Sequence, residues 1–201
     1  MCGIIGISSN KSVSANIINS LKKLEYRGYD SAGIATLVKG NINEVKCEGR
    51  VDALERDINK FNLKGEIGIG HVRWATHGKP SKINAHPHSS EEVSLVHNGI
   101  IENSTILKKF LEKKGYLFKS QTDTEVIAHL VHYFTSKNES FEKSCEVSIA
   151  QQLASDNEKL QGQLYSRVFF EDQLSPRVGV RIGRFFDLLD QVAGLSFSGQ
   201  K

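Results

Sequence analysis

The sequence predicts a layered α+β domain, and three observations support that fold class. Short apolar stretches alternate with segments in which apolar residues recur every three or four positions, a pattern typical of strands and amphipathic helices. Lys39-Gly40-Asn41 lies between two strand-like stretches and favours a hairpin over regular βαβ units. With 39% hydrophobic and 24% charged residues among 201, the composition is that of a globular protein with a core.

The first elements follow from the apolar pattern. Residues 2–8 predict a short buried strand, and Asn10 or Ser12 can cap the helix that follows. One face of that helix carries Val13, Ile17, Leu21 and Leu24. Residues 33–38 and 43–47 are the expected hairpin strands. A second amphipathic helix is indicated by Val51, Leu54, Ile58 and Phe61.

The middle of the chain continues with strands. Residues 67–74 predict a strand, which a polar loop follows as far as Glu92. Residues 93–96 predict another strand, which stops at Asn98-Gly99.

Two helices are expected next. The first has Asn103 or Ser104 as its cap and Gly115 as its stop. It is expected to turn Leu107, Phe110 and Leu111 inward. Thr122 and Glu125 fit a capping box for the second helix. The apolar face of this second helix is Val126, Leu130, Val131 and Phe134.

The character of the sequence changes after about Lys137, where polar residues dominate. Short strands are expected at residues 167–170 and 178–182, and a helix at residues 185–192. We therefore divide the chain into a domain of residues 2–136 and a segment of residues 137–201, which either completes that domain or is a divergent or altered tail.

Composition and charge exclude several classes of partner. A net charge of +3 without a dense Lys/Arg block argues against nucleic-acid and membrane partners. The sequence has neither an apolar stretch of membrane-spanning length nor a signal peptide. Its three cysteines are irregularly spaced and argue for a reducing compartment, so we expect a cytoplasmic protein.

Cys2 is a candidate nucleophile. The aminopeptidase that removes Met1 tolerates a small second residue, and its action would leave Cys2 with a thiol and a free α-amine. The two groups titrate near pH ~8.5 and ~8, so they can act as nucleophile and base in a neutral cell. The alternative is that Cys2 only opens a buried strand.

The polar loop and the strands on either side of it are rich in histidine. His71, His77, His86, His88 and His97 fall between positions 71 and 97, so a zinc site is one interpretation. Their spacing matches no common zinc pattern, and we expect no metal.

Other residues of this region suit an amino acid substrate. Arg73 offers a planar fork for a carboxylate and Asp123 an anion for an ammonium group, although either can be an ordinary surface or capping residue. Asn98-Gly99 can be a tight turn, an oxyanion hole or both.

Six motifs in this order resemble one protein family. They are Cys2-Gly3-Ile4, residues 24–33 (LEYRGYDSAG), residues 73–78 (RWATHG), residues 84–88 (NAHPH), residues 97–103 (HNGIIEN) and residues 122–125 (TDTE). The pattern is similar to the glutaminase domain of glutamine–fructose-6-phosphate aminotransferases. These are class II glutamine amidotransferases of the N-terminal-nucleophile hydrolase type.

The resemblance implies a fold and a set of roles. The implied fold is a four-layer αββα sandwich, which the segment after about residue 137 either completes or leaves incomplete. Cys2 would attack the glutamine side-chain amide, while Asn98 and the Gly99 N–H would hold the oxyanion. Residues that would bind the substrate are Arg73, Thr76, His77 and Asp123. Trp74 would help close the route by which ammonia leaves, and no cofactor is needed.

The resemblance also limits the expected reaction. Family members carry a second half of sugar-isomerase domains that binds fructose 6-phosphate, and residues 1–201 contain no such domains. We therefore expect L-glutamine as the direct partner and glutaminase as the activity. Two alternatives to this function stay open, a non-catalytic truncated remnant and a domain that serves another acceptor. Among assemblies, a homodimer is open.

Overall fold

The computed structural model describes residues 2–58, 60–138, 140–141, 143–145, 148 and 167–171. The strand expected at residues 178–182 and the helix expected at residues 185–192 lie outside these residues. Within the part of the chain that is described, no helix is long and apolar enough to cross a membrane.

Two antiparallel sheets form the centre of the molecule. The first contains β1 (Gly3–Ser8), β2 (Ser31–Val38), β3 (Asn41–Glu48) and β4 (Ile67–Arg73), in the order β1-β4-β2-β3. The second contains β5 (His88–Ser90), β6 (Val93–Asn98) and β7 (Arg167–Glu171), in that order. The predicted hairpin and the predicted strand at residues 167–170 are confirmed.

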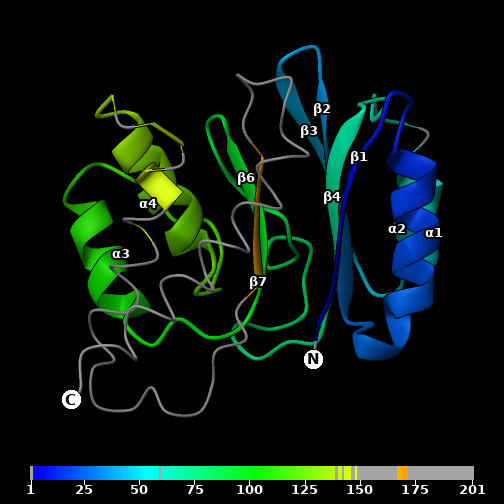
Figure 1. The fold of residues 1–201 in the computed structure, drawn as a ribbon. Helices are drawn as coiled ribbons and strands as arrows, with labels where there is room; N and C mark the ends of the chain where they lie inside the picture. The colour runs from blue at the N-terminus through cyan, green and yellow to red at the C-terminus, as the bar shows by residue number, and fades with distance from the viewer. Residues whose placement is uncertain are drawn as a thin grey trace, which may run out of the picture.

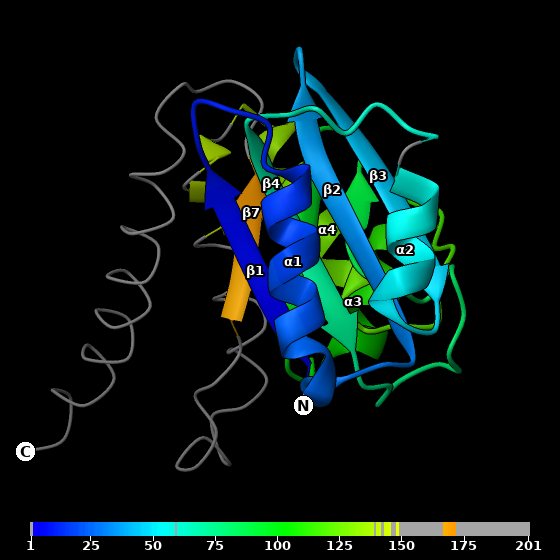
Figure 2. The same cartoon turned by 90° about the vertical axis from the view of Figure 1, so that its right-hand side faces the viewer.

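Helices cover the outer faces of the two sheets. Helices α1 (Ser14–Leu24) and α2 (Val51–Ile58) lie on the first sheet, on the side away from the second sheet (Figures 1 and 2). A short 3₁₀ helix, η1 (Glu25–Arg27), links α1 to β2. Helices α3 (Ser104–Glu112) and α4 (Glu125–Thr135) lie beyond the second sheet (Figure 1). The predicted mixture of helix and sheet is confirmed.

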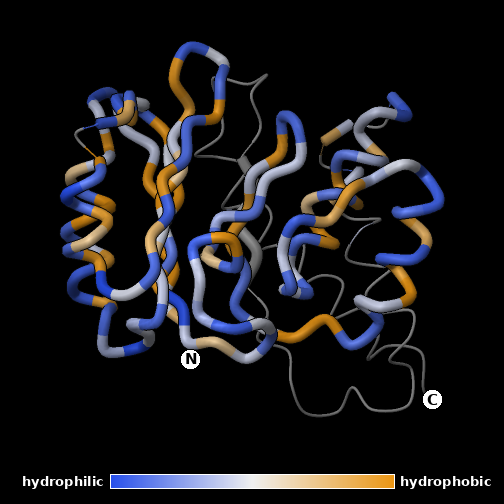
Figure 3. The backbone as a smooth tube through the Cα atoms, turned by 180° about the vertical axis from the view of Figure 1, so that it is seen from behind, coloured by the Kyte–Doolittle hydropathy of each residue, from blue (hydrophilic) through white to orange (hydrophobic). Residues whose placement is uncertain are grey.

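Hydrophobic residues fill the space between these layers. Ile17, Leu21 and Ile34 belong to a cluster under α1 and α2, and Leu95, Leu111 and Leu130 to one under α3 and α4. A third, smaller cluster joins the two sheets and consists of Ala35, Ile69 and Val96 with Ile4 and Ile42. In Figure 3 the hydrophobic turns of the helices next to the first sheet face that sheet, as an amphipathic pattern requires.

Several predicted details are wrong. Helix α1 begins after Val13 without a side-chain capping bond, so neither Asn10 nor Ser12 caps it. Helix α2 ends at Ile58, and Phe61 is half exposed. Phe110 points partly to solvent, and its ring contacts Tyr133 instead of the core.

The expected capping box of α4 is also wrong. Thr124, not Thr122, precedes the helix, and no side chain caps its first amides. The Glu125 carboxylate instead accepts the backbone N–H groups of Lys119 and Ser120, at 2.9 and 2.7 Å. Glu125 therefore ties the chain before α4 to the first turn of that helix.

Strand β5 was missed because the loop up to Glu92 is polar in sequence. Its residues are nevertheless largely buried, since His88 and Ser90 bond to side chains of the segment before α4 and of α4 itself. When the buried side chains of a strand are polar and hydrogen-bonded, its sequence shows no alternation of hydrophobic and polar residues.

Candidate active site

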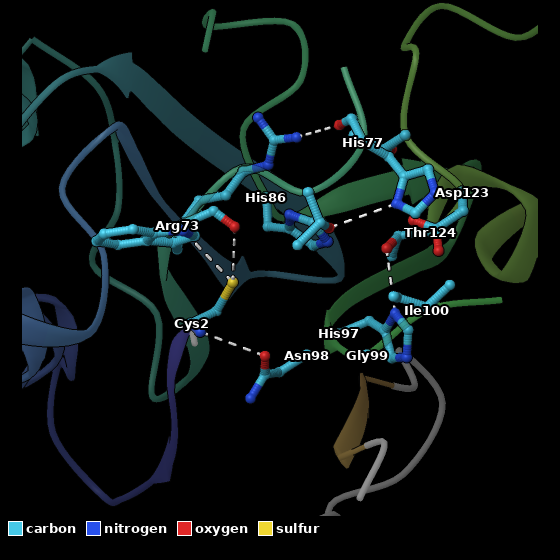
Figure 4. Close-up of a pocket in the computed structure, with 13 residues that line it drawn as sticks. Cys2, Arg73, His77, His86, His97, Asn98, Gly99, Ile100, Asp123 and Thr124 are labelled. Atoms are coloured by element: carbon cyan, nitrogen blue, oxygen red, sulfur yellow. Dashed lines mark hydrogen bonds between the residues drawn. The ribbon is translucent and has the colours of Figure 1, made fainter. Parts of the chain in front are cut away.

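Strand register places Cys2 beside the end of β4. Gly3 pairs with Val72 in the antiparallel β1–β4 ladder, so the residue before Gly3 lies opposite Arg73. The Trp74 N–H donates to Cys2 Sγ over 3.4 Å, and Sγ lies 3.7 Å from the Trp74 carbonyl oxygen (Figure 4). The thiol is thus held by backbone groups at the point where β4 ends.

Asn98 is the last residue of β6 and faces Cys2. The Cys2 backbone N–H donates to Asn98 Oδ1 over 3.3 Å (Figure 4). Because the carbonyl oxygen of the side-chain amide faces Cys2, its NH₂ group is the end left to donate elsewhere. Gly99 follows directly and is exposed, so its backbone can be approached closely.

Arg73 is almost fully buried, with 3% of its surface exposed. Its Nη2 donates to the carbonyl oxygens of His77 and Gly78, the second at 3.2 Å. Its Nη1 makes no hydrogen bond within the described residues and lies 4.0 Å from an Asp30 carboxylate oxygen. A buried guanidinium with unused donor capacity suits an incoming carboxylate.

Asp30 and Gly28 support the segment that follows β4. The Asp30 carboxylate accepts the Ala75 N–H, and the Asp30 N–H donates to the Arg73 carbonyl at 3.2 Å. A Cβ on Gly28 would lie 2.5 Å from the Arg73 carbonyl oxygen and 2.7 Å from the Trp74 nitrogen. Only glycine therefore lets this turn pack against the backbone that holds the Cys2 thiol.

Asp123 lies just before α4 and is 9% exposed. Its Oδ2 accepts the Ile101 N–H over 2.7 Å. A carboxylate offers about four lone-pair sites, so capacity for an ammonium group is left.

These segments enclose one cavity of about 200 Å³. It is lined by Cys2, Arg73, Trp74, Thr76, His77, His86, His97, Asn98, Gly99, Ile100, Thr122, Asp123 and Thr124. All eight residues singled out from the sequence are among them, and Figure 4 shows Cys2, Arg73, Asn98 and Asp123 around the same space. The volume suits a ligand smaller than a drug-sized molecule.

Five lining residues have no site role predicted from the sequence, and these are His86, His97, Ile100, Thr122 and Thr124. His86 and His97 were noted only for the zinc interpretation. Among the described residues no group of three or more His, Cys, Asp or Glu side chains could hold a metal ion. Instead the His86 ring stacks on that of His71, with ring centres 4.2 Å apart.

Burial sets the ionisation of the site. It raises the pKa of the Cys2 thiol, and the hydrogen bond from the Trp74 backbone only partly offsets that shift. It also lowers the pKa of His71 to about 3 and that of His97 to about 4. At neutral pH the thiol and the two imidazoles are therefore uncharged, and the thiol needs a base before it can attack.

Known proteins resemble this chain in sequence and in fold. Residues 71–160 match the family model of the glutamine amidotransferase domain. This chain carries a glutamine amidotransferase domain. It is 56% identical over 140 residues to glutamine–fructose-6-phosphate aminotransferase of Clostridium acetobutylicum, covering 69% of this chain and 23% of that protein. The corresponding enzyme of Bartonella quintana is 46% identical over 183 residues, which cover 91% of this chain and 29% of that protein.

A solved structure shows that the amidotransferase domain has a known fold. Glutamine phosphoribosylpyrophosphate amidotransferase of B. subtilis superposes with a TM-score of 0.63 at 28% identity, covering 75% of this chain and 33% of that one. The fold is thus that of the N-terminal-nucleophile hydrolase type of amidotransferase, with mixed helix and sheet. The chain spans about a quarter of the length of the curated relatives it matches.

Proposed function

We propose that this amidotransferase domain hydrolyses L-glutamine to glutamate and ammonia, with Cys2 as nucleophile after removal of Met1. The observation that carries the proposal is the meeting of Cys2, Asn98, Arg73 and Asp123 around one cavity. These residues come from four separate segments of the chain. They supply a nucleophile, a hydrogen-bond donor for the oxyanion, and one positive and one negative group to bind the substrate's charges.

The proposed reaction has two stages. The α-amine of Cys2 takes the thiol proton while Sγ attacks the amide carbon, and the negative charge moves to the amide oxygen. Asn98 Nδ2 and the Gly99 N–H stabilise that oxygen, by roughly 3–4 kcal/mol for a well-placed donor. The C–N bond then breaks, and the protonated α-amine gives its proton to the departing nitrogen, which leaves as ammonia.

Water completes the cycle. The α-amine removes a proton from a water molecule, whose oxygen attacks the γ-glutamyl thioester. The C–S bond breaks, glutamate leaves, and the sulfur recovers its proton. The raised pKa of the Cys2 thiol supports a role for the amine, because little thiolate is present without a base.

Four residues are proposed to hold the substrate's backbone. Arg73, whose buried Nη1 makes no hydrogen bond within the described residues, would bind the carboxylate, with Thr76 and His77 on the same side. Asp123 would bind the ammonium group. Trp74, half exposed at the cavity and in edge contact with Tyr29, would close the route of ammonia.

For the whole protein we propose the ammonia-donating half of glucosamine-6-phosphate synthesis from fructose 6-phosphate. Identities of 46% and 56% to enzymes named for that acceptor favour it over phosphoribosylpyrophosphate, whose enzyme is 28% identical. We further propose that the two sheets and their outer helices are the four-layer αββα sandwich, that the protein works in the cytoplasm, and that a homodimer is its assembly.

Covalent trapping tests the proposal. An electrophilic glutamine analogue with a diazoketone in place of the amide should form one adduct, which peptide mapping by mass spectrometry locates at Cys2. An excess of L-glutamine should protect the thiol, while D-glutamine should not. Labelling at Cys47 or Cys145 instead, or no protection by L-glutamine, would contradict the assignment.

A further inference from the structure

We propose that the buried hydrogen bond between His97 and Thr124 is a positioning contact that holds the oxyanion residues in register with Asp123. The inference rests on the proposed glutaminase reaction and deepens it. It gives a role to two cavity-lining residues that the proposed chemistry leaves unused. Through this contact, amide activation and recognition of the substrate's ammonium group would depend on each other.

The contact joins the two segments that carry these functions. His97 directly precedes Asn98 and Gly99, and Thr124 directly follows Asp123. His97 Nδ1 lies 3.2 Å from Thr124 Oγ1, and both side chains are 2% exposed. In such a site a broken hydrogen bond leaves a polar atom unsatisfied and is not replaced by water without cost.

The His97 backbone is fixed independently by His71. His71 Nε2 lies 3.2 Å from the His97 carbonyl oxygen, and the His71 side chain is fully buried. A carbonyl oxygen can only accept, so the proton of the neutral His71 ring resides on Nε2. The end of β6 is therefore held from the first sheet by His71 and from the start of α4 by Thr124.

A second hydrogen bond joins the same two segments four residues after His97. The Ile101 N–H donates to Asp123 Oδ2 over 2.7 Å, so the segments 97–101 and 123–124 are joined at two points. Two hydrogen bonds fix both the distance and the relative orientation of these segments, whereas a single bond would let them rotate about it. Glutamine spans the two segments, so a small rotation would misplace either the oxyanion donors or the ammonium ligand.

A double-mutant cycle measures this coupling. The readout is the second-order rate constant for adduct formation at Cys2 by the diazoketone glutamine analogue, followed by intact mass. Adduct formation is stoichiometric, so it stays measurable in slow variants. Thr124→Val keeps the shape of the side chain and removes the bond. Thr124→Val should slow adduct formation about tenfold in the otherwise unchanged protein, but less than threefold in a protein that also carries Asp123→Asn.

Matched variants separate positioning from general damage. Thr124→Ser keeps the hydroxyl and should stay within about twofold of the unchanged protein. Thr135→Val removes a comparable hydroxyl bond in α4, to the Val131 carbonyl at 2.9 Å, but that residue does not line the cavity. It should also have an effect below about twofold.

The outcomes are distinct. If Thr124→Val slows adduct formation by the same factor in both backgrounds, or by less than twofold, the positioning role is wrong. A loss that reflects only misfolded protein would appear as equal factors, because it scales both backgrounds alike. If the unchanged protein forms no adduct at Cys2, the proposed function itself fails, which is a different result.

Discussion

At the scale of single residues, the proposed site offers hydrogen-bond donors that the described residues leave unused. Arg73 Nη1 is buried without a hydrogen bond among the described residues, and Asn98 keeps its NH₂ group for another acceptor. The sequence identified both residues by type and motif. It could not show that Arg73 Nη2 is already used by the carbonyl oxygens of His77 and Gly78.

Arg73→Lys tests the carboxylate contact at this scale. A lysine ammonium is a point charge that cannot hold the two loop carbonyls and also present a fork to a carboxylate. We expect KM for glutamine to rise about 10- to 100-fold, equivalent to ~1.4–2.8 kcal/mol, while kcat changes less than about threefold. Steady-state glutaminase kinetics measure both values.

The exposed Arg56 on α2 provides the control, because Arg56→Lys makes the same chemical change away from the cavity. Its kinetics should match those of the unchanged protein. A drop in kcat with an unchanged KM for Arg73→Lys would argue against a contact with the substrate's carboxylate.

At the scale of elements, the register of strands and the ends of helices bring the site together. The order of strands along the chain and the β2–β3 hairpin were predictable, because turn and alternation signals are local. The pairing of β1 with β4, which places Cys2 beside Trp74, joins residues far apart in sequence and has no local signal. The start of α4 was misread for a related reason, since Glu125 bonds to the preceding loop and not to a capping partner.

Glu125→Gln tests how far this loop depends on a single carboxylate. Burial alone raises the pKa of Glu125, but the nearby His129 ring and the hydrogen bonds from Lys119 and Ser120 outweigh burial and lower the pKa to about 2. The neutral amide can accept fewer of these bonds, so we expect about 1–3 kcal/mol less free energy of unfolding at pH 7. Urea denaturation followed by circular dichroism measures the difference.

The same variant should change the pH dependence of stability. A folded-state pKa below the ordinary value means that the carboxylate stabilises the fold above about pH 4.5, and that this contribution is lost as the pH falls toward 2. The difference between the two proteins should therefore shrink across that range. A difference that stays constant from pH 7 to pH 3 would show that the charge of Glu125 is not the cause.

At the scale of the whole molecule, the second sheet depends on a strand that comes late in the chain. β7 pairs with residues 94–98 of β6, with Arg167 opposite Asn98 and Val168 opposite His97. The strand itself is predictable from its apolar residues, but its pairing with β6 has no signal in the sequence. Composition changes after about residue 137 and gives no pairing information.

Proline substitutions in β7 test whether this pairing matters. Successive residues of an antiparallel strand turn their N–H groups to opposite sides, so of Val168→Pro and Phe169→Pro one removes a bond to β6 and the other changes an N–H that points away from β6. We expect one variant to have a markedly lower melting temperature and slower adduct formation at Cys2. Equal and small effects of both would mean that β6 does not need β7.

Turnover of glutamine by Cys2→Ala is the most direct test of the central claim. Released glutamate and ammonia would be measured for the unchanged protein and the variant in parallel, with intact mass on both samples to establish that Met1 is absent. The account predicts equimolar glutamate and ammonia from the unchanged protein and no turnover above background from Cys2→Ala. Undiminished turnover by the folded variant would contradict it.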